Sequence, residues 1–302
     1  MVLEIAFNNH STIHSGQGKK HGHRGRGKNK NLKVYLNNVN GLVCRADSVK
    51  DILETERPDI AVFCETKASN LFVASFFESL NYVPAIKPRL SCNSGGVVIA
   101  VRNALSQSFT ESSTSLHDNI CSGMLKSDNL NLKIIAAYGP QEKEKQEVRD
   151  AFYEELTIEL ESGNEEGCYS LIIGDLNAKI SKNNEGMIES LSPNGELLST
   201  LMSDHNLIAV NHLDRCIGKW TRQNRCNDEE KSVLDYILVH ENMADSITEV
   251  VVDEDLLLTP YNVIKEKGGN LSVKYTDHNA LLLQLKDIFR KPKTEVKKPA
   301  GW

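Results

Sequence analysis

The chain has 302 residues, of which 40% are hydrophobic and 25% are charged, as in an ordinary globular protein of one large domain or two small ones. Apolar runs such as 171–173 and 256–258 are far shorter than the roughly 20 residues that a spanning helix needs, so we expect no membrane span. Glu4 lies where a signal peptide would be apolar, and the seven cysteines are odd in number and irregularly spaced. We therefore expect an intracellular protein, nuclear or cytoplasmic, that is not secreted.

The net charge of −6 is unevenly distributed along the chain. Residues 1–33 hold seven Lys and Arg against one acid, and residues 286–302 hold six against two. Residues 34–285 therefore carry 22 basic and 38 acidic side chains, a net charge of −16. This acidic body argues against unspecific binding of nucleic acid. A polyanion would have to bind at a local cluster, at the basic ends or through metal ions.

Residues 1–31 are predicted to form a disordered basic arm. From 8 to 31 the sequence is rich in Gly, His, Lys and Asn with almost no apolar side chain, so it cannot bury enough surface to order itself. A solvated tail and a DNA-contacting arm are both compatible with its charge. A folded domain is predicted over 32–286.

Hydrophobic periodicity predicts the strands and helices of this domain. Apolar residues over 32–39 indicate a strand that ends at Gly41, and helical spacing followed by Pro58 indicates a helix over 45–57. A buried strand over 59–64 completes a compact α/β unit. Further strands are predicted at 95–101, 132–138, 169–174, 234–239 and 279–285, and helices at 142–161 and 195–204. Strands outnumber helices, which favours a mixed-sheet α/β protein with helices outside packed sheets.

The end of the chain differs in composition from the domain. Residues 287–302 are rich in Lys and Pro and are predicted to form a linker. The chain ends at Trp302 without completing a helix or strand, so we expect it to be the front piece of a longer protein.

Polar side chains follow the apolar strands where each strand ends. Asn38 and Asn40 lie two residues apart and can therefore face the same cleft. Glu65 ends a buried strand, where an unpaired carboxylate is costly and a hard cation such as Mg²⁺ would relieve the cost. Asp175 and Asn177 form a second pair two residues apart. Strand ends are where α/β sheets usually place their sites.

Three more polar elements belong to the same pattern. Asp235 lies within an otherwise apolar strand, Asp277 and His278 precede the last predicted strand, and Tyr138 ends a strand before a turn. Taken singly, each element also fits a turn, a cap, a surface pair or a core residue. Together they supply a metal ligand, a water-orienting carboxylate, neutral donors for an oxyanion and an oriented histidine, which phosphoryl chemistry requires.

In this order, these residues resemble the endonuclease/exonuclease/phosphatase superfamily. That superfamily includes abasic-site endonucleases, DNase I, inositol polyphosphate phosphatases and the endonuclease domains of non-LTR (LINE-type) retrotransposons. The resemblance runs from about Leu32 to Leu285. It implies an α/β fold, namely a four-layer α/β sandwich in which two mixed β-sheets pack face to face with helices on the outside.

The resemblance also implies a metal site and a substrate contact beside it. Glu65 would bind Mg²⁺, or Mn²⁺ as the alternative ion, and Asn38 would belong to the same metal site. Asp277 would complete the site at or near the metal. Asn40 stands where abasic-site enzymes commonly have an acid, and it is assigned to substrate binding.

The catalytic roles are implied in the same way. Asp175 would orient or deprotonate the attacking water, and Asn177 and Tyr138 would hold the scissile phosphate. His278 would stabilise the charge that develops on the phosphate, and Asp235 would fix the orientation of His278.

Within the superfamily, three phrases look most like the retrotransposon group. They are Asn-Val-Asn-Gly-Leu over 38–42, Trp-Thr-Arg over 220–222, and Thr-Asp-His over 276–278. Trp220 and Arg222 are accordingly assigned to substrate binding. Proteins of this group continue into a reverse transcriptase, which would explain the open-ended linker. The stretch around the late Asp lacks the Trp-Cys-Asp-Arg type segment of inositol phosphatases.

The resemblance therefore implies Mg²⁺-dependent hydrolysis of a phosphodiester. The expected enzyme is a DNA endonuclease that nicks a target strand and leaves a 3′-hydroxyl, which could prime reverse transcription in retrotransposition. A phosphomonoesterase or an RNA-cleaving enzyme with the same site is an alternative, since fold does not settle substrate. A catalytically inactive binding module is a third. Loops over 181–194 and 212–231 are the expected determinants of target choice.

Overall fold

The computed structural model describes most of the chain between the predicted arm and the predicted linker. The described residues are 31–87, 95–112, 115–127, 130–162, 168–182, 187–227 and 229–286. The predicted arm, apart from its last residue, and the predicted linker lie outside the described residues. In the part of the chain that the structure describes, no helix has the length and apolar character needed to cross a membrane.

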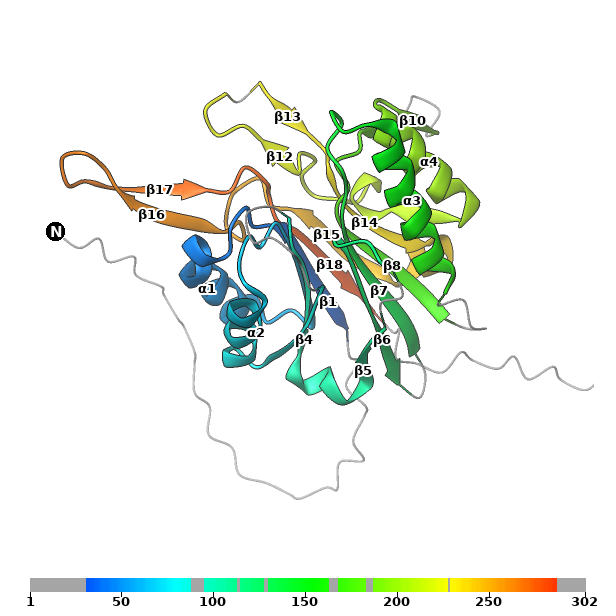
Figure 1. The fold of residues 1–302 in the computed structure, drawn as a ribbon, viewed down its shortest axis with the longest axis horizontal. Coiled ribbons are helices and arrows are strands. Elements are labelled where there is room, and N and C mark those ends of the chain that lie inside the picture. Colours follow the sequence, from blue (N-terminus) through cyan, green and yellow to red (C-terminus); the bar gives the residue numbers. More distant parts are fainter. Residues whose placement is uncertain are drawn as a thin grey trace, which may run out of the picture.

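Two mixed six-stranded sheets form the centre of the molecule (Figure 1). The first contains β1 (Leu32–Asn38), β2 (Ile60–Cys64), β3 (Tyr82–Ile86), β4 (Val97–Arg102), β15 (Ile247–Val252) and β18 (Leu281–Leu285), in the order β15-β18-β1-β2-β4-β3. The second contains β5 (Phe109–Glu111), β6 (Ile120–Ser127), β7 (Leu130–Tyr138), β8 (Cys168–Asp175), β11 (Leu207–Ala209) and β14 (Asp235–His240), in the order β11-β14-β8-β7-β6-β5. Each sheet has one parallel pair at its centre, β1 with β2 and β7 with β8.

Side-chain alternation along the strands divides the core into three layers. In β1, Leu36 belongs to the cluster between the sheets, together with Ile134 of β7. Its neighbour Tyr35 faces the opposite way and packs against helices. In β7, Ile135 likewise belongs to the cluster on the outer face of the second sheet. Every strand at the centre is therefore buried on both faces.

In the described part of the chain, four helices cover the outer faces of the two sheets (Figure 1). They are α1 (Ala46–Glu56), α2 (Asn70–Ser79), α3 (Gln146–Glu161) and α4 (Pro193–Asp204). Helices α1 and α2 bury Ile52 and Phe77 against the first sheet. Helices α3 and α4 bury Phe152 and Leu198 against the second. The predicted four-layer α/β sandwich is confirmed.

Among the described residues, three short hairpins extend from the sandwich. They are β9 (Ile180–Lys182) with β10 (Ile188–Ser190), β12 (Arg222–Gln223) with β13 (Lys231–Ser232), and β16 (Tyr261–Lys265) with β17 (Leu271–Tyr275). Four 3-10 turns complete the described elements: η1 (Val43–Arg45), η2 (Asn103–Ser108), η3 (Val210–His212) and η4 (Glu241–Ser246). Figure 1 shows the β12–β13 and β16–β17 hairpins projecting beyond the sheets.

The strand pattern brings the predicted polar elements to one end of the sandwich. The parallel pairs β1–β2 and β7–β8 end in Asn38, Cys64, Tyr138 and Asp175. The antiparallel strand β14 begins with Asp235, which lies opposite Asp175 in the register. Ends of strands from both sheets therefore meet, as expected for a site in an α/β protein.

Gly174, next to the end of β8, permits the close approach of β7. A Cβ atom at this position would lie 1.7 Å from the carbonyl oxygen of Ala137. We expect Gly174→Ala to lower the free energy of unfolding by about 3 kcal/mol or more, because backbone has to move to relieve the overlap. Urea unfolding would measure it, with Gly268→Ala as the matched variant, since that residue has φ +114° but no atom within 4 Å. Equal losses in the two variants would contradict the prediction.

Candidate active site

The predicted site residues meet in one cleft of about 390 Å³ at the end of the sandwich. Of the predicted residues, the cleft is lined by Asn40, Glu65, Tyr138, Asp175, Asn177, Arg222, Asp277 and His278. Asn38 and Asp235 are buried behind this lining and contact it through hydrogen bonds. Trp220 lines a neighbouring cavity instead of the cleft.

Asn38 connects the carboxylates of the two sheets. Its Nδ2 donates hydrogen bonds to Glu65 Oε1 at 3.0 Å and to Asp175 Oδ2 at 2.8 Å. Its Oδ1 accepts a hydrogen bond from the backbone N–H of Asn40 at 3.1 Å, which sets the orientation of the amide. Because Asn38 is fully buried at the end of β1, it holds both carboxylates in a fixed relation.

Glu65 directly follows β2 in a left-handed conformation, with a φ of 53°. Its Oε1 accepts a hydrogen bond from the Tyr138 hydroxyl at 2.8 Å, and its Oε2 lies 2.6 Å from Lys67 Nζ. Burial opposes ionisation of Glu65, but the hydrogen bonds from Asn38, Lys67 and Tyr138 outweigh it and lower the pKa of this carboxyl. Glu65 is therefore ionised at neutral pH.

Asp175 is the buried carboxylate of the second sheet, with 1% of its surface exposed. Its Oδ1 accepts a hydrogen bond from the backbone N–H of Asn177 at 3.1 Å, in addition to the bond from Asn38. Burial and the charge of Asp235 raise the pKa of Asp175 to about 7, although His278 and Asn38 act in the opposite direction. A carboxylate with a pKa near 7 is suited to accept a proton at neutral pH.

His278 and Asp235 form a buried pair. His278 Nδ1 lies 2.8 Å from Asp235 Oδ2, and His278 Nε2 lies 3.9 Å from Asp175 Oδ2. Burial favours the neutral ring, but Asp235 and then Asp175 outweigh it and raise the pKa of His278 to about 10. The imidazolium then donates from Nδ1 to Asp235 and keeps its second N–H for the cleft.

The Asp235→Asn variant tests this pair in metal-free protein. Loss of the carboxylate removes the main group that stabilises the imidazolium, so the pKa of His278 is expected to fall from about 10 toward its ordinary value of 6.5. Since the folded pKa is raised, the stability from this pair is present below pH 6.5 and is lost as the pH rises through about 10. NMR titration of the ring carbons would measure the pKa. An unchanged titration in Asp235→Asn would refute the assigned cause.

Asn177 and Tyr138 also line the cleft. Asn177 has a φ of 48°, and its Nδ2 donates a hydrogen bond to the carbonyl of Gly139 at 2.9 Å. Gly139 is needed there, because a Cβ atom would lie 2.3 Å from the Leu176 carbonyl oxygen. Burial and the charge of Glu65 raise the pKa of Tyr138, so its hydroxyl stays protonated and can act as a donor.

Charged groups of both signs line the rim of the cleft. Arg222 Nε donates a hydrogen bond to Asp277 Oδ2 at 3.2 Å, and Lys67 Nζ donates one to Asn40 Oδ1 at 2.6 Å. Burial opposes ionisation of Asp277, but His278 and Arg222 outweigh it and lower its pKa. The rim thus offers cationic donors close to ionised oxygen ligands.

Several residues support the site without having been assigned to it from the sequence. The Thr221 hydroxyl accepts hydrogen bonds from the backbone N–H groups of Leu234 and Asp235 at 2.9 and 3.0 Å. The Thr276 hydroxyl donates to the Asn38 carbonyl at 2.9 Å. Both threonines lie inside the phrases over 220–222 and 276–278, which was the available signal. Lys67 follows Glu65 by two residues, but its spacing alone does not indicate a salt bridge.

Two sets of side chains are candidates for holding a metal ion. Asp175, Asp235 and His278 each offer one ligand atom within 4.8 Å of the others. In this set His278 Nδ1 is already engaged with Asp235 Oδ2 at 2.8 Å, so its Nε2 is the ring atom left for an ion. Glu65 and Asp277 offer ionised carboxylate oxygens in the cleft, which is the donor type that Mg²⁺ and Mn²⁺ prefer.

Two facing mixed sheets, with a cleft of carboxylates, amides and one histidine at the strand ends, define a class of four-layer hydrolases. The family model that matches the sequence is the Endonuclease/Exonuclease/phosphatase family, over residues 37–278. The chain belongs to this family of nucleases and phosphatases, which confirms the resemblance seen in the sequence. No curated protein matches the chain.

Solved structures agree with this fold. An AP endonuclease from Archaeoglobus fulgidus has a TM-score of 0.62 at 17% identity, over 85% of this chain and 99% of that chain. The endonuclease domain of TRAS1, a telomere-specific non-LTR retrotransposon, has a TM-score of 0.60 at 16% identity, over 85% and 98%. A 3′ phosphatase from Neisseria, bound to a product DNA hairpin, has a TM-score of 0.63 at 16% identity, over 84% and 99%. At these identities the likeness concerns the fold.

Proposed function

We propose that the protein is a metal-dependent DNA endonuclease that nicks one strand and leaves a 3′-hydroxyl. The observation that carries this proposal is the junction of the two sheets at Asn38, which places the carboxylates of Glu65 and Asp175 on either side of one amide. A carboxylate for a cation and a carboxylate for a water molecule are thereby held beside the same scissile phosphate. Phosphodiester hydrolysis requires this combination.

In the proposed mechanism, Asp175 takes the proton of the attacking water. Its pKa of about 7 matches this role at neutral pH. Asn38 and the backbone of Asn177 orient the carboxylate, so that water bound to it attacks phosphorus in line with the leaving 3′-oxygen. The bond from phosphorus to this oxygen breaks, the leaving oxygen takes up a proton from solvent, and the products are a 3′-hydroxyl and a 5′-phosphate.

Charge that develops on the phosphate is met by fixed donors. His278 offers its Nε2–H, and the Asp235 contact on Nδ1 holds the ring in place. The side-chain amide of Asn177 donates one N–H to the Gly139 carbonyl, and its second N–H can donate to a phosphate oxygen. Tyr138 also lines the cleft, but its single hydroxyl proton is donated to Glu65 Oε1, so it can hold the phosphate only by releasing that carboxylate.

Glu65 is the residue we propose to hold Mg²⁺ or Mn²⁺, together with Asp277, which lines the same cleft. When bound, the ion supplies Lewis-acid stabilisation of negative charge on the phosphate oxygens. Asn38 presents an N–H to Glu65, so we assign it to positioning this carboxylate. Lys67 forms a salt bridge with the second carboxylate oxygen of Glu65. When the ion binds this oxygen, Lys67 would have to move away or share the oxygen with the ion.

DNA is the proposed substrate, and a retrotransposon enzyme fused to a reverse transcriptase is the proposed context. The likeness to the TRAS1 endonuclease domain and the phrases over 38–42, 220–222 and 276–278 support it. Arg222 and Asn40, at the rim of the cleft, are proposed substrate contacts. The phosphomonoesterase alternative is kept because a 3′ phosphatase from Neisseria has the same fold.

The substrate class is tested by two assays with the same purified protein. Nicking of supercoiled plasmid reports the endonuclease, and release of inorganic phosphate from a 3′-phosphorylated oligonucleotide reports the phosphatase. We expect nicking to exceed phosphate release at equal enzyme concentration. Phosphate release without nicking would replace the proposal by the alternative.

The metal site is tested by Glu65→Gln. The substitution removes the negative charge and keeps the shape, so we expect the Mg²⁺ concentration for half-maximal nicking to rise by about tenfold or more. Glu54→Gln is the matched control, since Glu54 is exposed on α1 and does not line the cleft. An unchanged Mg²⁺ dependence in Glu65→Gln would show that this carboxylate does not hold the metal ion.

A further inference from the structure

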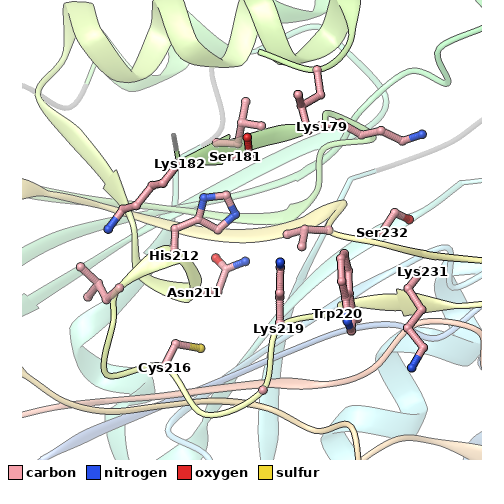
Figure 2. A pocket seen from close by; sticks show the side chains of 15 residues that line it. Lys179, Ser181, Lys182, Asn211, His212, Cys216, Lys219, Trp220, Lys231 and Ser232 are labelled. Carbon is pink, nitrogen blue, oxygen red and sulfur yellow. The ribbon is translucent and has the colours of Figure 1, made fainter. Parts of the chain in front are cut away.

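A second cavity lies beside the cleft and is not used by the proposed chemistry. Its volume is about 500 Å³, and it shares Lys179 and Ser232 with the cleft. The walls come from β9, from η3, from the segment over 216–220 and from β13, as Figure 2 shows. A molecule in this cavity would therefore be adjacent to a substrate in the cleft.

The cavity is basic, although residues 34–285 carry a net charge of −16. None of its described lining residues is acidic, and four are lysines: Lys179, Lys182, Lys219 and Lys231. Asp214 is an exposed acid whose Oδ1 lies 3.7 Å from Lys182 Nζ. The nearby Glu254 is engaged with the backbone N–H groups of Lys219 and Trp220. Figure 2 shows the ammonium end of Lys219 in the middle of the group and those of Lys179, Lys182 and Lys231 extending outward; together they make this part of the surface locally positive, which favours an anion.

An aromatic ring and unpartnered polar atoms accompany these lysines. Trp220 is half-buried in the wall, and Lys219 Nζ lies 4.5 Å from its ring centroid. Asn211 is 6% exposed, and its Oδ1 has no hydrogen-bond partner among the described residues. The same holds for Nδ1 of His212. Burial and then Lys182 and Lys219 lower the pKa of His212 to about 4, so its ring is neutral.

We propose that this cavity binds one nucleotide unit, with its phosphate among the lysines, its base against Trp220 and a polar edge of the base at Asn211. Aromatic stacking combined with a cationic groove is the common way to hold an unpaired nucleotide. Figure 2 shows Trp220 and Lys231 on one side of the cavity and His212 and Lys182 on the other. The bound nucleotide is either part of the DNA strand that passes the cleft or a free nucleotide. In the first case the site rests on the proposed function.

Fluorescence tests the binding without any turnover. The chain has two tryptophans, Trp220 and Trp302, so Trp302→Phe leaves Trp220 as the only one. In EDTA we expect dAMP to change this fluorescence saturably, with inorganic phosphate and deoxyadenosine at least about tenfold weaker. Lys182→Ala and Lys219→Ala should each raise the dissociation constant about three- to tenfold. Lys50→Ala, exposed on α1, should leave it unchanged.

The source of the nucleotide is distinguished by nicking kinetics on a duplex oligonucleotide. If the DNA strand supplies it, Lys182→Ala raises KM about three- to tenfold with kcat retained, and a short single strand binds more tightly than dAMP. If a free nucleotide supplies it, dAMP binds below about 1 mM and KM is unchanged. Equal binding by wild type, Lys182→Ala and Lys219→Ala, or no binding at all, overturns the site. If the protein binds dAMP in EDTA but never nicks DNA, the proposed function is refuted, whereas the nucleotide site in the cavity is retained.

Discussion

Replacement of Asp175 by asparagine is expected to lower the rate of plasmid nicking by a factor between about 10² and 10⁴. An amide cannot take the proton of the attacking water. It also has one acceptor oxygen, whereas Asp175 accepts hydrogen bonds at both, from Asn177 N–H and from Asn38 Nδ2. The open-circle product formed in a single turnover, at saturating Mg²⁺, would measure the loss.

The control for this variant is Asp204→Asn, an exposed acid at the end of α4. It makes the same chemical change outside the cleft and should nick at the wild-type rate. Urea unfolding of both variants would show that Asp175→Asn is folded. Nicking near the wild-type rate by folded Asp175→Asn would refute its role as the base.

His278→Ala is expected to have the second large effect, a loss of about 10²- to 10³-fold in kcat. The change removes the only imidazole in the described lining of the cleft and with it the donor at Nε2. It also leaves the Asp235 carboxylate buried without its partner, so stability is expected to fall by about 3–5 kcal/mol.

The stability loss has to be separated from the loss of catalysis. The double variant His278→Ala with Asp235→Asn removes the unpaired charge and should regain stability while nicking stays low. His205→Ala, a histidine that does not line the cleft, should nick normally. A double variant that nicked at the wild-type rate would show that His278 serves folding alone.

Much of the fold was predictable because strands buried on both faces are short apolar runs. The runs at 59–64 and 169–174 correspond to β2 and β8, which differ from them by one or two residues at the ends. The strand β6 escaped prediction because Ser122, Gly123 and Lys126 interrupt its apolar pattern. The helix expected from 142 begins at Gln146, since Lys145 is still extended, with a ψ of 152°.

The members of the site were predictable, but their contacts were not. A polar residue at the end of a buried strand stands out in the sequence, as Glu65 and Asp175 do. That Asn38 contacts both depends on the packing of two sheets, because Asn38 and Asp175 are 137 residues apart. Trp220 was expected to bind substrate, and its place in the neighbouring basic cavity depends on how the segment over 216–220 folds against β9 and η3.

The central claim is that this cleft nicks DNA with the help of a divalent cation. The most direct measurement is conversion of supercoiled plasmid to open circles by the full chain, in Mg²⁺ and in EDTA, with Asp175→Asn alongside. We predict open circles in Mg²⁺ alone, with 3′ ends that a DNA polymerase extends without prior treatment. Open circles that form equally in EDTA or with Asp175→Asn, or no nicking by folded wild-type protein, would contradict the account.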